Sequence, residues 1–218
     1  MQKPDLHTIT APCILAINLN LSDGSSLTID EVVRVIPSKR LVCKGIRHQK
    51  SVYAKIFIGD KNLAYAKRDE TGVKALQLAN IETPSLLCSA GIVGNKGHAL
   101  VFEAIEKAQN AEGVWVKLNQ KQRLSLAKSL VLEIAKHHHA GLLQTDLYFK
   151  NFLVSDEKIY TLDGDGIRQY THLSERQALQ NLSVLLSKFD VLDIEIWLAD
   201  LLKTYAEARD WQQAQMQR

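Results

Sequence analysis

Hydrophobic residues alternate with polar ones over much of the first half of the chain and recur every three to four positions in the second half. Alternation with a period of two is typical of half-buried strands, whereas a period of three to four is typical of amphipathic helices. The pattern predicts six strands: one over 11–21, three within 32–58, and one each over 85–93 and 99–105.

Helical periodicity is found in segments 62–79 and 119–140, and in two tail segments within 174–217 that break near Asp190. Gly141 stands just past the second of these helices, where glycine often ends a helix by adopting a left-handed conformation. Strands followed by helices predict an α+β fold with a β-rich first part and a compact, helical second part.

The densest group of candidate catalytic residues lies between the long helix and the tail. Asp146 precedes Asn151 by five residues, and Asp163 follows after a predicted short strand. This is the order and spacing of the catalytic loop and metal-binding turn of protein-kinase-like enzymes. Phosphoryl transfer needs a carboxylate that accepts the hydroxyl proton and oxygen ligands for the Mg²⁺ ions that bridge the ATP phosphates. Asp146 is the candidate base, and Asn151 and Asp163 are candidate metal ligands, although the same residue types also form ordinary turns.

A lysine that binds nucleotide phosphates is expected on a strand near the front of such a fold. Lys55 lies in the run Val-Tyr-Ala-Lys-Ile, which is similar to the Val-Ala-Ile-Lys signature of kinases. Its acidic partner is predicted to be Glu70 on the following helix. Asp69 and Glu82 are rival partners, and most Lys and Glu side chains are solvated surface charges.

The order Lys55, Glu70, Asp146, Asn151, Asp163 matches the kinase order, and the chain resembles the lipopolysaccharide kinase family. These bacterial kinase-like proteins phosphorylate inner-core heptose or 3-deoxy-manno-octulosonic acid. The segments that carry the resemblance are Tyr53–Ile56, Lys67–Glu70 with Ile81–Pro84, His139–Asp146, Asn151–Leu153 and Leu162–Asp165. The resemblance implies one kinase-like domain over 1–218, with an N-lobe over about 1–106 and a C-lobe over about 107–218. It also implies ATP and Mg²⁺ as cofactors and a sugar or lipid-linked sugar as acceptor.

The chain departs from the usual kinase pattern in front of Lys55, where no Gly-x-Gly-x-x-Gly occurs. Lys39 and Arg40, in the turn of the first hairpin, are therefore expected to cover the phosphates with side chains instead of glycine amides. Residues 102–105 are expected to form the hinge, where Glu103 and Ile105 would offer backbone groups to adenine.

Two further departures affect the catalytic segment. Gln144 and Thr145 replace the usual His-Arg before the catalytic Asp, and the loss of that Arg argues against control by a phosphorylated loop. Asp165, two residues after Asp163, either contacts a second metal ion or caps the turn. Only about fifty residues follow Gly166, which favours a small or lipid-linked acceptor over a protein.

Composition and net charge indicate which kinds of partner the chain can bind. The chain has 218 residues, of which 46% are apolar and 23% charged, an ordinary globular balance. The net charge of +3 is compatible with anionic lipid or phosphorylated sugar, and no nucleic-acid partner is expected. The basic cluster over 39–50 is interpreted as a charged hairpin edge in preference to a membrane surface. The sequence carries no signal for an oligomeric state.

No apolar run approaches the roughly 20 residues that span a bilayer. We therefore expect a cytoplasmic protein, with peripheral contact at the cytoplasmic face of the inner membrane compatible with its charge. The three cysteines lack metal-ligand spacing, and their odd number in a chain without a secretory signal suggests reduced thiols. Three consecutive histidines, 137–139, point about 100° apart on a helix and cannot chelate one ion together. Their favourable interaction with the helix C-terminus is a sufficient explanation.

Two alternative functions come from other classes. The missing glycine loop, the Gln144-Thr145 replacement and the short second part also fit a pseudokinase that serves as a binding or scaffold protein. A kinase of another small metabolite, such as an amino alcohol or aminoglycoside, is the other alternative. A negative patch near Asp146 would favour that function.

Overall fold

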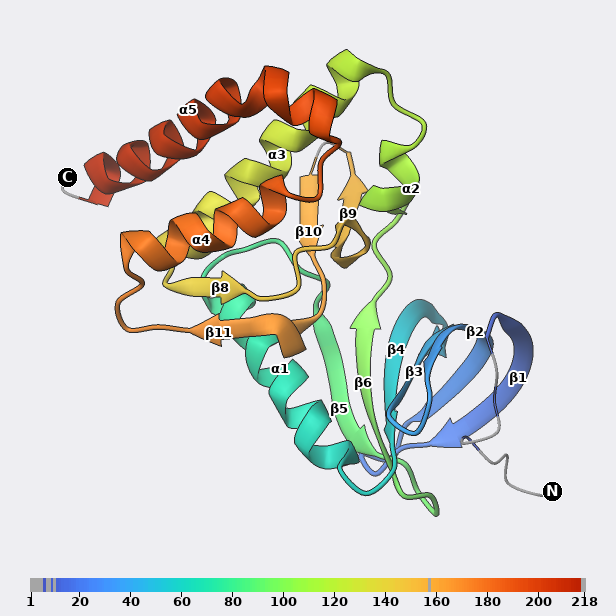
Figure 1. Cartoon of the computed structure of the whole chain (residues 1–218). Coiled ribbons are helices and arrows are strands. Elements are labelled where there is room, and N and C mark those ends of the chain that lie inside the picture. Colours follow the sequence, from blue (N-terminus) through green and yellow to red (C-terminus); the bar gives the residue numbers. More distant parts are fainter. Residues whose placement is uncertain (1–5, 7–8, 10, 157, 217–218) are drawn as a thin grey trace. The chain divides into compact units, whose positions relative to one another are not determined.

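The computed structural model describes residues 6, 9, 11–156 and 158–216 (Figure 1). It divides into two compact units. Unit 1 runs to Thr71 and resumes over Pro84–Ile105, and unit 2 comprises Gly72–Thr83 and the chain from Glu106 onward. One division thus falls next to the residue 106 boundary expected from the sequence, whereas residues 72–83 group with the helical unit.

Unit 1 is built on an antiparallel sheet with the strand order β1-β2-β3-β4-β6-β5. These are the six strands that the alternating pattern predicts. Their bounds are β1 Cys13–Asn20, β2 Ser26–Ile36, β3 Arg40–Arg47, β4 Lys50–Ile58, β5 Leu86–Gly91 and β6 Gly97–Glu103. Along β4, Val52, Ala54 and Ile56 are buried in the core of the unit. Because successive strand residues point to opposite faces, Lys55 projects from the other face of the sheet.

Helix α1, Asn62–Leu78, begins in unit 1 and ends in unit 2. Its buried stripe consists of Ala66, Asp69, Val73 and Leu76, spaced three and four residues apart as helical geometry requires. Asp69 is the one charged member of this stripe and is fully buried. Glu70, the next residue, lies on a different face and is partly exposed.

Unit 2 is mainly helical, with a core between α3 and α5 that contains Leu130, Ile134 and Leu201. Its helices are α2 Ala111–Trp115, α3 Gln120–His139, α4 Glu175–Leu186 and α5 Val191–Met216. Asn119 caps α3 through a capping box with Gln122. Gly141 has a φ of 70°, which confirms the predicted left-handed stop after α3. Within the described ranges, no helix is both long and apolar enough to cross a membrane.

Short strand pairs in unit 2 position the catalytic segment. The strands are β7 Gln109–Asn110, β8 Leu142–Gln144, β9 Phe152–Ser155, β10 Lys158–Thr161 and β11 Ile167–Gln169. In the pairing of β8 with β11, Gln144 lies opposite Ile167, and in the pairing of β9 with β10, Phe152 lies opposite Thr161. The loop 145–151 and the turn 162–166, which connect these strands, are therefore held next to each other.

Candidate functional site

In unit 1, Lys55 is paired with Asp69. The Lys55 ammonium lies 2.7 Å and 2.9 Å from the two carboxylate oxygens of Asp69. The predicted pairing with Glu70 is therefore wrong, because Asp69 takes that place while the Glu70 carboxylate accepts a hydrogen bond from Ser89. The stripe of Ala66, Asp69 and Leu76 on α1 was a sequence signal for this outcome, since a residue at that spacing faces inward.

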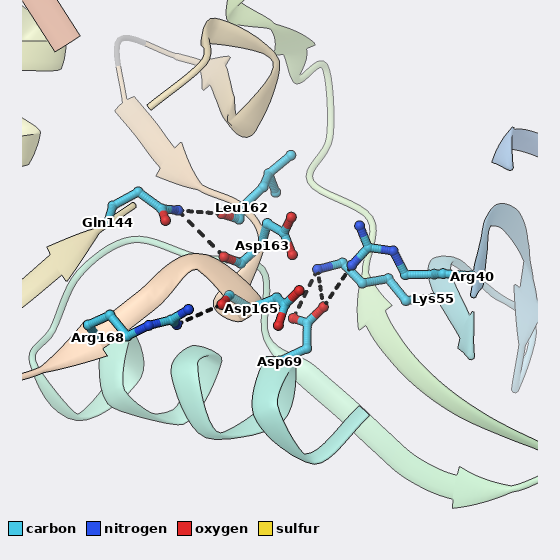
Figure 2. A network of polar contacts seen from close by, with 8 residues as sticks. All are labelled: Arg40, Lys55, Asp69, Gln144, Leu162, Asp163, Asp165 and Arg168. Carbon is cyan, nitrogen blue, oxygen red and sulfur yellow. Dashed lines mark hydrogen bonds and ion pairs between the residues drawn. The ribbon is translucent and has the colours of Figure 1, made fainter. Parts of the chain in front are cut away.

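Arg40 joins the same carboxylate from the β2–β3 hairpin. Its guanidinium Nη1 lies 3.2 Å from Asp69 Oδ2, and Figure 2 shows Lys55 and Arg40 both reaching Asp69. Only 5% of Arg40 is exposed, and its guanidinium also lies over the Phe57 ring. Two cations thus share one buried carboxylate.

The turn of this hairpin is fixed to the end of β4. Ser38 has a left-handed φ of 56°, and the Lys39 carbonyl accepts a hydrogen bond from the Ile58 N–H at 3.0 Å. The Lys39 ammonium lies 4.5 Å from the centre of the Tyr65 ring on α1. The hairpin therefore contributes cationic side chains where the sequence lacks a glycine-rich loop.

Glu103 ends β6 at the expected hinge. Its carboxylate accepts hydrogen bonds from the Ser85 hydroxyl and N–H at 2.8 Å and 3.1 Å, and its own N–H donates to the Ser85 carbonyl. The Glu103 N–H is thus engaged within unit 1, so the prediction that Glu103 offers a backbone group to adenine rests on its carbonyl. Ile105 lies two residues beyond the strand, at the end of unit 1.

In unit 2, the Asn151 side chain ties the catalytic loop together. Its amide Nδ2 donates to the Asp146 carbonyl at 2.8 Å, and the backbone carbonyl of Asn151 accepts a hydrogen bond from the Leu162 N–H at 2.8 Å. Asn151 is buried, with 5% of its surface exposed, whereas Asp146 is partly exposed. The structure therefore brings together Asp146, Asn151 and the segment that carries Asp163, as their spacing predicts.

Gln144 is a site residue that the sequence analysis did not assign. Its fully buried amide donates to the Leu162 carbonyl at 3.3 Å, and Figure 2 shows it directed at the Leu162 and Asp163 carbonyls. Its Oε1 accepts from the Asp146 N–H at 3.3 Å. One side chain thus connects the loop of the candidate base to the turn of the candidate metal ligand. Its position in place of the kinase His was the only signal in the sequence.

The turn after β10 has an unusual backbone. Asp163 has a φ of 65° and a ψ of 80°, a left-handed conformation that is uncommon for a residue other than glycine. The Gly166 N–H closes the turn by donating to the Asp163 carbonyl at 3.2 Å, and Arg168 donates to the Asp165 carbonyl at 2.9 Å. Backbone strain of this kind is concentrated at functional sites.

Gly72 of α1 packs directly against this turn. A Cβ atom at Gly72 would collide with the backbone carbonyl of Gly164. Only glycine allows the helix backbone to approach the turn so closely. The second part of α1 is therefore part of the support of the Asp163 segment.

This combination of loop and turn corresponds to a known family. The model of the lipopolysaccharide kinase (Kdo/WaaP) family matches residues 64–218. The chain belongs to this family. A comparison with curated proteins gave no match. The family match includes Asp69, Asp146, Asn151 and Asp163, but it begins after Arg40 and Lys55, so the cations of the sheet lie outside it.

Membership of the lipopolysaccharide kinase family implies a phosphotransferase that acts on lipopolysaccharide sugars. The residues fit the Mg²⁺ that such kinases typically use. With Nδ2 of Asn151 committed to Asp146, its Oδ1 is the atom left to act as a ligand. Amide and carboxylate oxygens are the ligands that Mg²⁺ prefers, and it is usually held by one or two carboxylates together with substrate phosphates. Among the described side chains, no cluster of three or more His, Cys, Asp or Glu residues forms a separate metal site.

The consecutive histidines have a different role from the one predicted. His137 and His138 are buried, and burial lowers the pKa of His137 to about 3 and that of His138 to about 4. They are therefore neutral, so a favourable charge at the helix C-terminus does not explain these two residues. His138 lies 2.8 Å from the Tyr205 hydroxyl and 3.0 Å from Asn181 Oδ1, while Asn181 donates to the Gln144 carbonyl. These histidines support the core and the strand that leads to Asp146.

Proposed function

We propose that this protein is an ATP-dependent kinase that transfers the γ-phosphate to a sugar hydroxyl of the lipopolysaccharide inner core. The observation that carries the proposal is the hydrogen-bonded connection of Asp146, Asn151 and the Leu162-Asp163 segment. Family membership supports the choice of sugar. We also propose that units 1 and 2 are the N-lobe and C-lobe of a protein-kinase-like fold.

Each residue is assigned a role by its chemistry. Lys55 binds the ATP phosphates, and Asp69, in place of Glu70, orients Lys55. Arg40 stands beside Lys55 on the same carboxylate and adds a second cation toward the phosphates, with Lys39 at the hairpin turn above Tyr65. The Glu103 carbonyl and the Ile105 backbone are the groups left at the hinge to contact adenine.

In the reaction, Asp146 accepts the proton of the sugar hydroxyl while the oxygen of that hydroxyl forms a bond to the γ-phosphorus. The bond from that phosphorus to the β,γ-bridging oxygen breaks, and ADP leaves. Asn151 and Asp163 hold Mg²⁺, with Asp165 as an additional ligand from the same turn. Bound Mg²⁺ supplies neutralisation of the phosphate charge.

The test is a calorimetric titration of ATP with and without Mg²⁺ on the wild type and on Asp163→Ala. Asp156→Ala, at the exposed turn between β9 and β10, is the matched control because it removes an Asp that also has a positive φ. We expect binding that depends on Mg²⁺ in the wild type and in the control and is lost in Asp163→Ala. A folded wild type that binds no ATP would refute the kinase proposal and favour a pseudokinase scaffold.

The acceptor is tested with the purified wild type, ATP, Mg²⁺ and lipopolysaccharide from which the inner-core phosphates have been removed. We expect labelled phosphate from the γ-position to appear on the core sugars. Transfer to an aminoglycoside or an amino alcohol, with none to the lipopolysaccharide, would assign the enzyme to another small metabolite.

A further inference from the structure

Two lysines share one aromatic ring beside the candidate base. The ammonium of Lys150 lies 4.8 Å from the centre of the Tyr148 ring, and that of Lys188 lies 4.5 Å from it. Tyr148 and Lys150 belong to the loop between Asp146 and Asn151, whereas Lys188 follows α4. Tyr148 is 48% exposed, so solvent reaches this residue.

A rigid aromatic cluster brings Lys188 to this loop. The ring of Phe149, which lies between Tyr148 and Lys150 in the sequence, packs against the ring of Phe189, the neighbour of Lys188, with ring centres 5.4 Å apart. The Trp115 ring centre lies 5.0 Å from that of Phe149 and 5.4 Å from that of Phe189. The side chain of Asn110, the last residue of β7, donates to the Lys150 carbonyl at 2.7 Å and fixes the loop. Lys150 and Lys188 therefore both place their ammonium groups against the Tyr148 ring.

No carboxylate neutralises these lysines within the part of the chain that the structure describes, where neither ammonium forms an ion pair. Asp190, two residues after Lys188, is paired instead with Arg123 at 3.3 Å. Cation–π contact with Tyr148 leaves both positive charges without a countercharge among the described residues. An anionic group that binds here would supply that countercharge.

We propose that Lys150 and Lys188, oriented by Tyr148, form a receptor for an anionic group carried by the acceptor next to the hydroxyl that becomes phosphorylated. The inference rests on the proposed function and narrows its substrate class to sugars that bear a carboxylate or a phosphate. Hydrogen bonds between charged partners are the strongest available, and fixing a neighbouring group orients the hydroxyl toward Asp146. The two positive charges of this receptor disfavour cationic acceptors such as aminoglycosides.

The test measures KM and kcat for deacylated lipopolysaccharide core oligosaccharide, with its charges intact or neutralised by methyl esterification and phosphate removal. We expect Lys150→Gln and Lys188→Gln each to raise the KM of the charged oligosaccharide about 5- to 30-fold, as loss of a charged hydrogen bond implies, with little change in kcat. Neither variant should change the KM of the neutralised oligosaccharide. Lys121→Gln, an exposed lysine on α3, is the matched control and should match the wild type.

Tyr148 is tested as a positioning residue. Tyr148→Phe keeps the ring and should preserve the KM, whereas Tyr148→Leu removes the cation–π contact and should raise it as the lysine variants do. An unchanged KM in both lysine variants, or an equal increase for the neutralised oligosaccharide, would overturn the proposal.

Failure of the receptor and failure of the kinase proposal give different results. If the wild type transfers no phosphate, the affinity of the wild type and of Lys188→Gln for the charged oligosaccharide can still be measured by calorimetry without ATP. Weaker binding by the variant supports the receptor, and equal binding overturns it. A second experiment measures binding of the wild type and the lysine variants to vesicles containing phosphatidylglycerol. If the lysine variants lose vesicle binding but keep the oligosaccharide KM of the wild type, the anion is a lipid headgroup. That result would overturn the acceptor proposal.

Discussion

In unit 1, the Asp69 carboxylate is the shared partner of the Lys55 and Arg40 cations. It has no exposed surface, and it contacts one cation from β4 and one from the β2–β3 hairpin. Breaking a buried ion pair by removing one partner is costly because the remaining charge stays buried without compensation. Asp69 therefore contributes to folding as well as to the orientation of Lys55.

Replacing Asp69 by Asn should reduce the free energy of unfolding by about 3–5 kcal/mol, since Lys55 and Arg40 lose the carboxylate charge that they share. Nucleotide affinity should fall as Lys55 loses its orientation. Urea denaturation and ATP calorimetry measure the two effects. Glu70→Gln is the matched control, because Glu70 bonds to Ser89 in an exposed position, and we expect a change within about 0.5 kcal/mol. A larger loss in the control than in Asp69→Asn would contradict this assignment.

Replacing Asp146 by Asn should lower turnover by about 10²- to 10⁴-fold, the usual contribution of one positioned base. The fold and the affinity for ATP should stay the same, because the Asp146 contacts with Asn151 and Gln144 involve its backbone. Phosphate transfer and calorimetry on the same preparation check this, with Asp156→Asn as control. Turnover equal to that of the wild type would exclude Asp146 as the base.

The sequence predicted some of these residues and not others for physical reasons. Asp146, Asn151 and Asp163 are recognisable because chain spacing alone brings them together in a loop and the following turn. Asp69 lies on the helical stripe of α1 with Ala66, Val73 and Leu76, but a hydrophobic pattern does not mark it because its side chain is charged. The roles of Gln144 and His138 depend on burial and on partners distant in sequence, which no local pattern shows.

Among the elements, the turn 162–166 has the tightest surroundings. Gln144 bonds to its carbonyls, and Gly72 of α1 contacts the Gly164 carbonyl without room for a side chain. The small elements β7, β8 and β11 and the five-residue helix α2 were not predicted, because two- to five-residue elements are too short to establish a period. The long helices and the six strands of the sheet were predicted because each spans several repeats.

Replacing Gly72 by Ala should displace the turn 162–166, for which we propose a metal-binding role, because the added methyl group cannot fit against the Gly164 backbone. Overpacking of this kind costs about 1–3 kcal/mol, and Mg²⁺-dependent ATP binding should weaken with it. Gly113→Ala in α2 is the matched control, since nothing lies within 4 Å of its added Cβ. Denaturation and calorimetry compare the two variants, and equal behaviour would show that the contact does not support the turn.

At the scale of the whole molecule, the α+β composition and the order of strands before helices agree with the pattern of the chain. The structure differs from the expected division in placing residues 72–83 with the helical unit. Periodicity does not reveal this, because α1 is one continuous helix whose two parts belong to different compact units.

Global stability should decrease as the pH falls from 7.5 to 5. His137 and His138 are neutral when folded, with pKa values lowered by burial to about 3 and about 4, whereas both titrate near 6.5 when unfolded. The unfolded chain therefore binds more protons below pH 6.5, and the stability lost between pH 6.5 and 5 should be about 2–3 kcal/mol for the pair. Glu133, whose pKa is raised by burial, has the opposite effect, because it adds stability as the pH falls through its folded pKa.

Urea denaturation at four pH values measures this dependence. His138→Gln should reduce the slope of stability against pH, while His172→Gln, an exposed histidine, should leave it unchanged. A flat profile in the wild type would show that the histidines are not buried in the neutral form.

The packing of Trp115 against Phe149 makes the catalytic loop optically observable. Trp197 lies 6.4 Å from Trp115, so two indole rings belong to the cluster beneath Tyr148 and Lys150. Indole emission depends on the immediate surroundings of the ring, so a shift of the loop on binding acceptor should change the intrinsic fluorescence. Engagement of the loop can then be followed in real time without a label and without turnover.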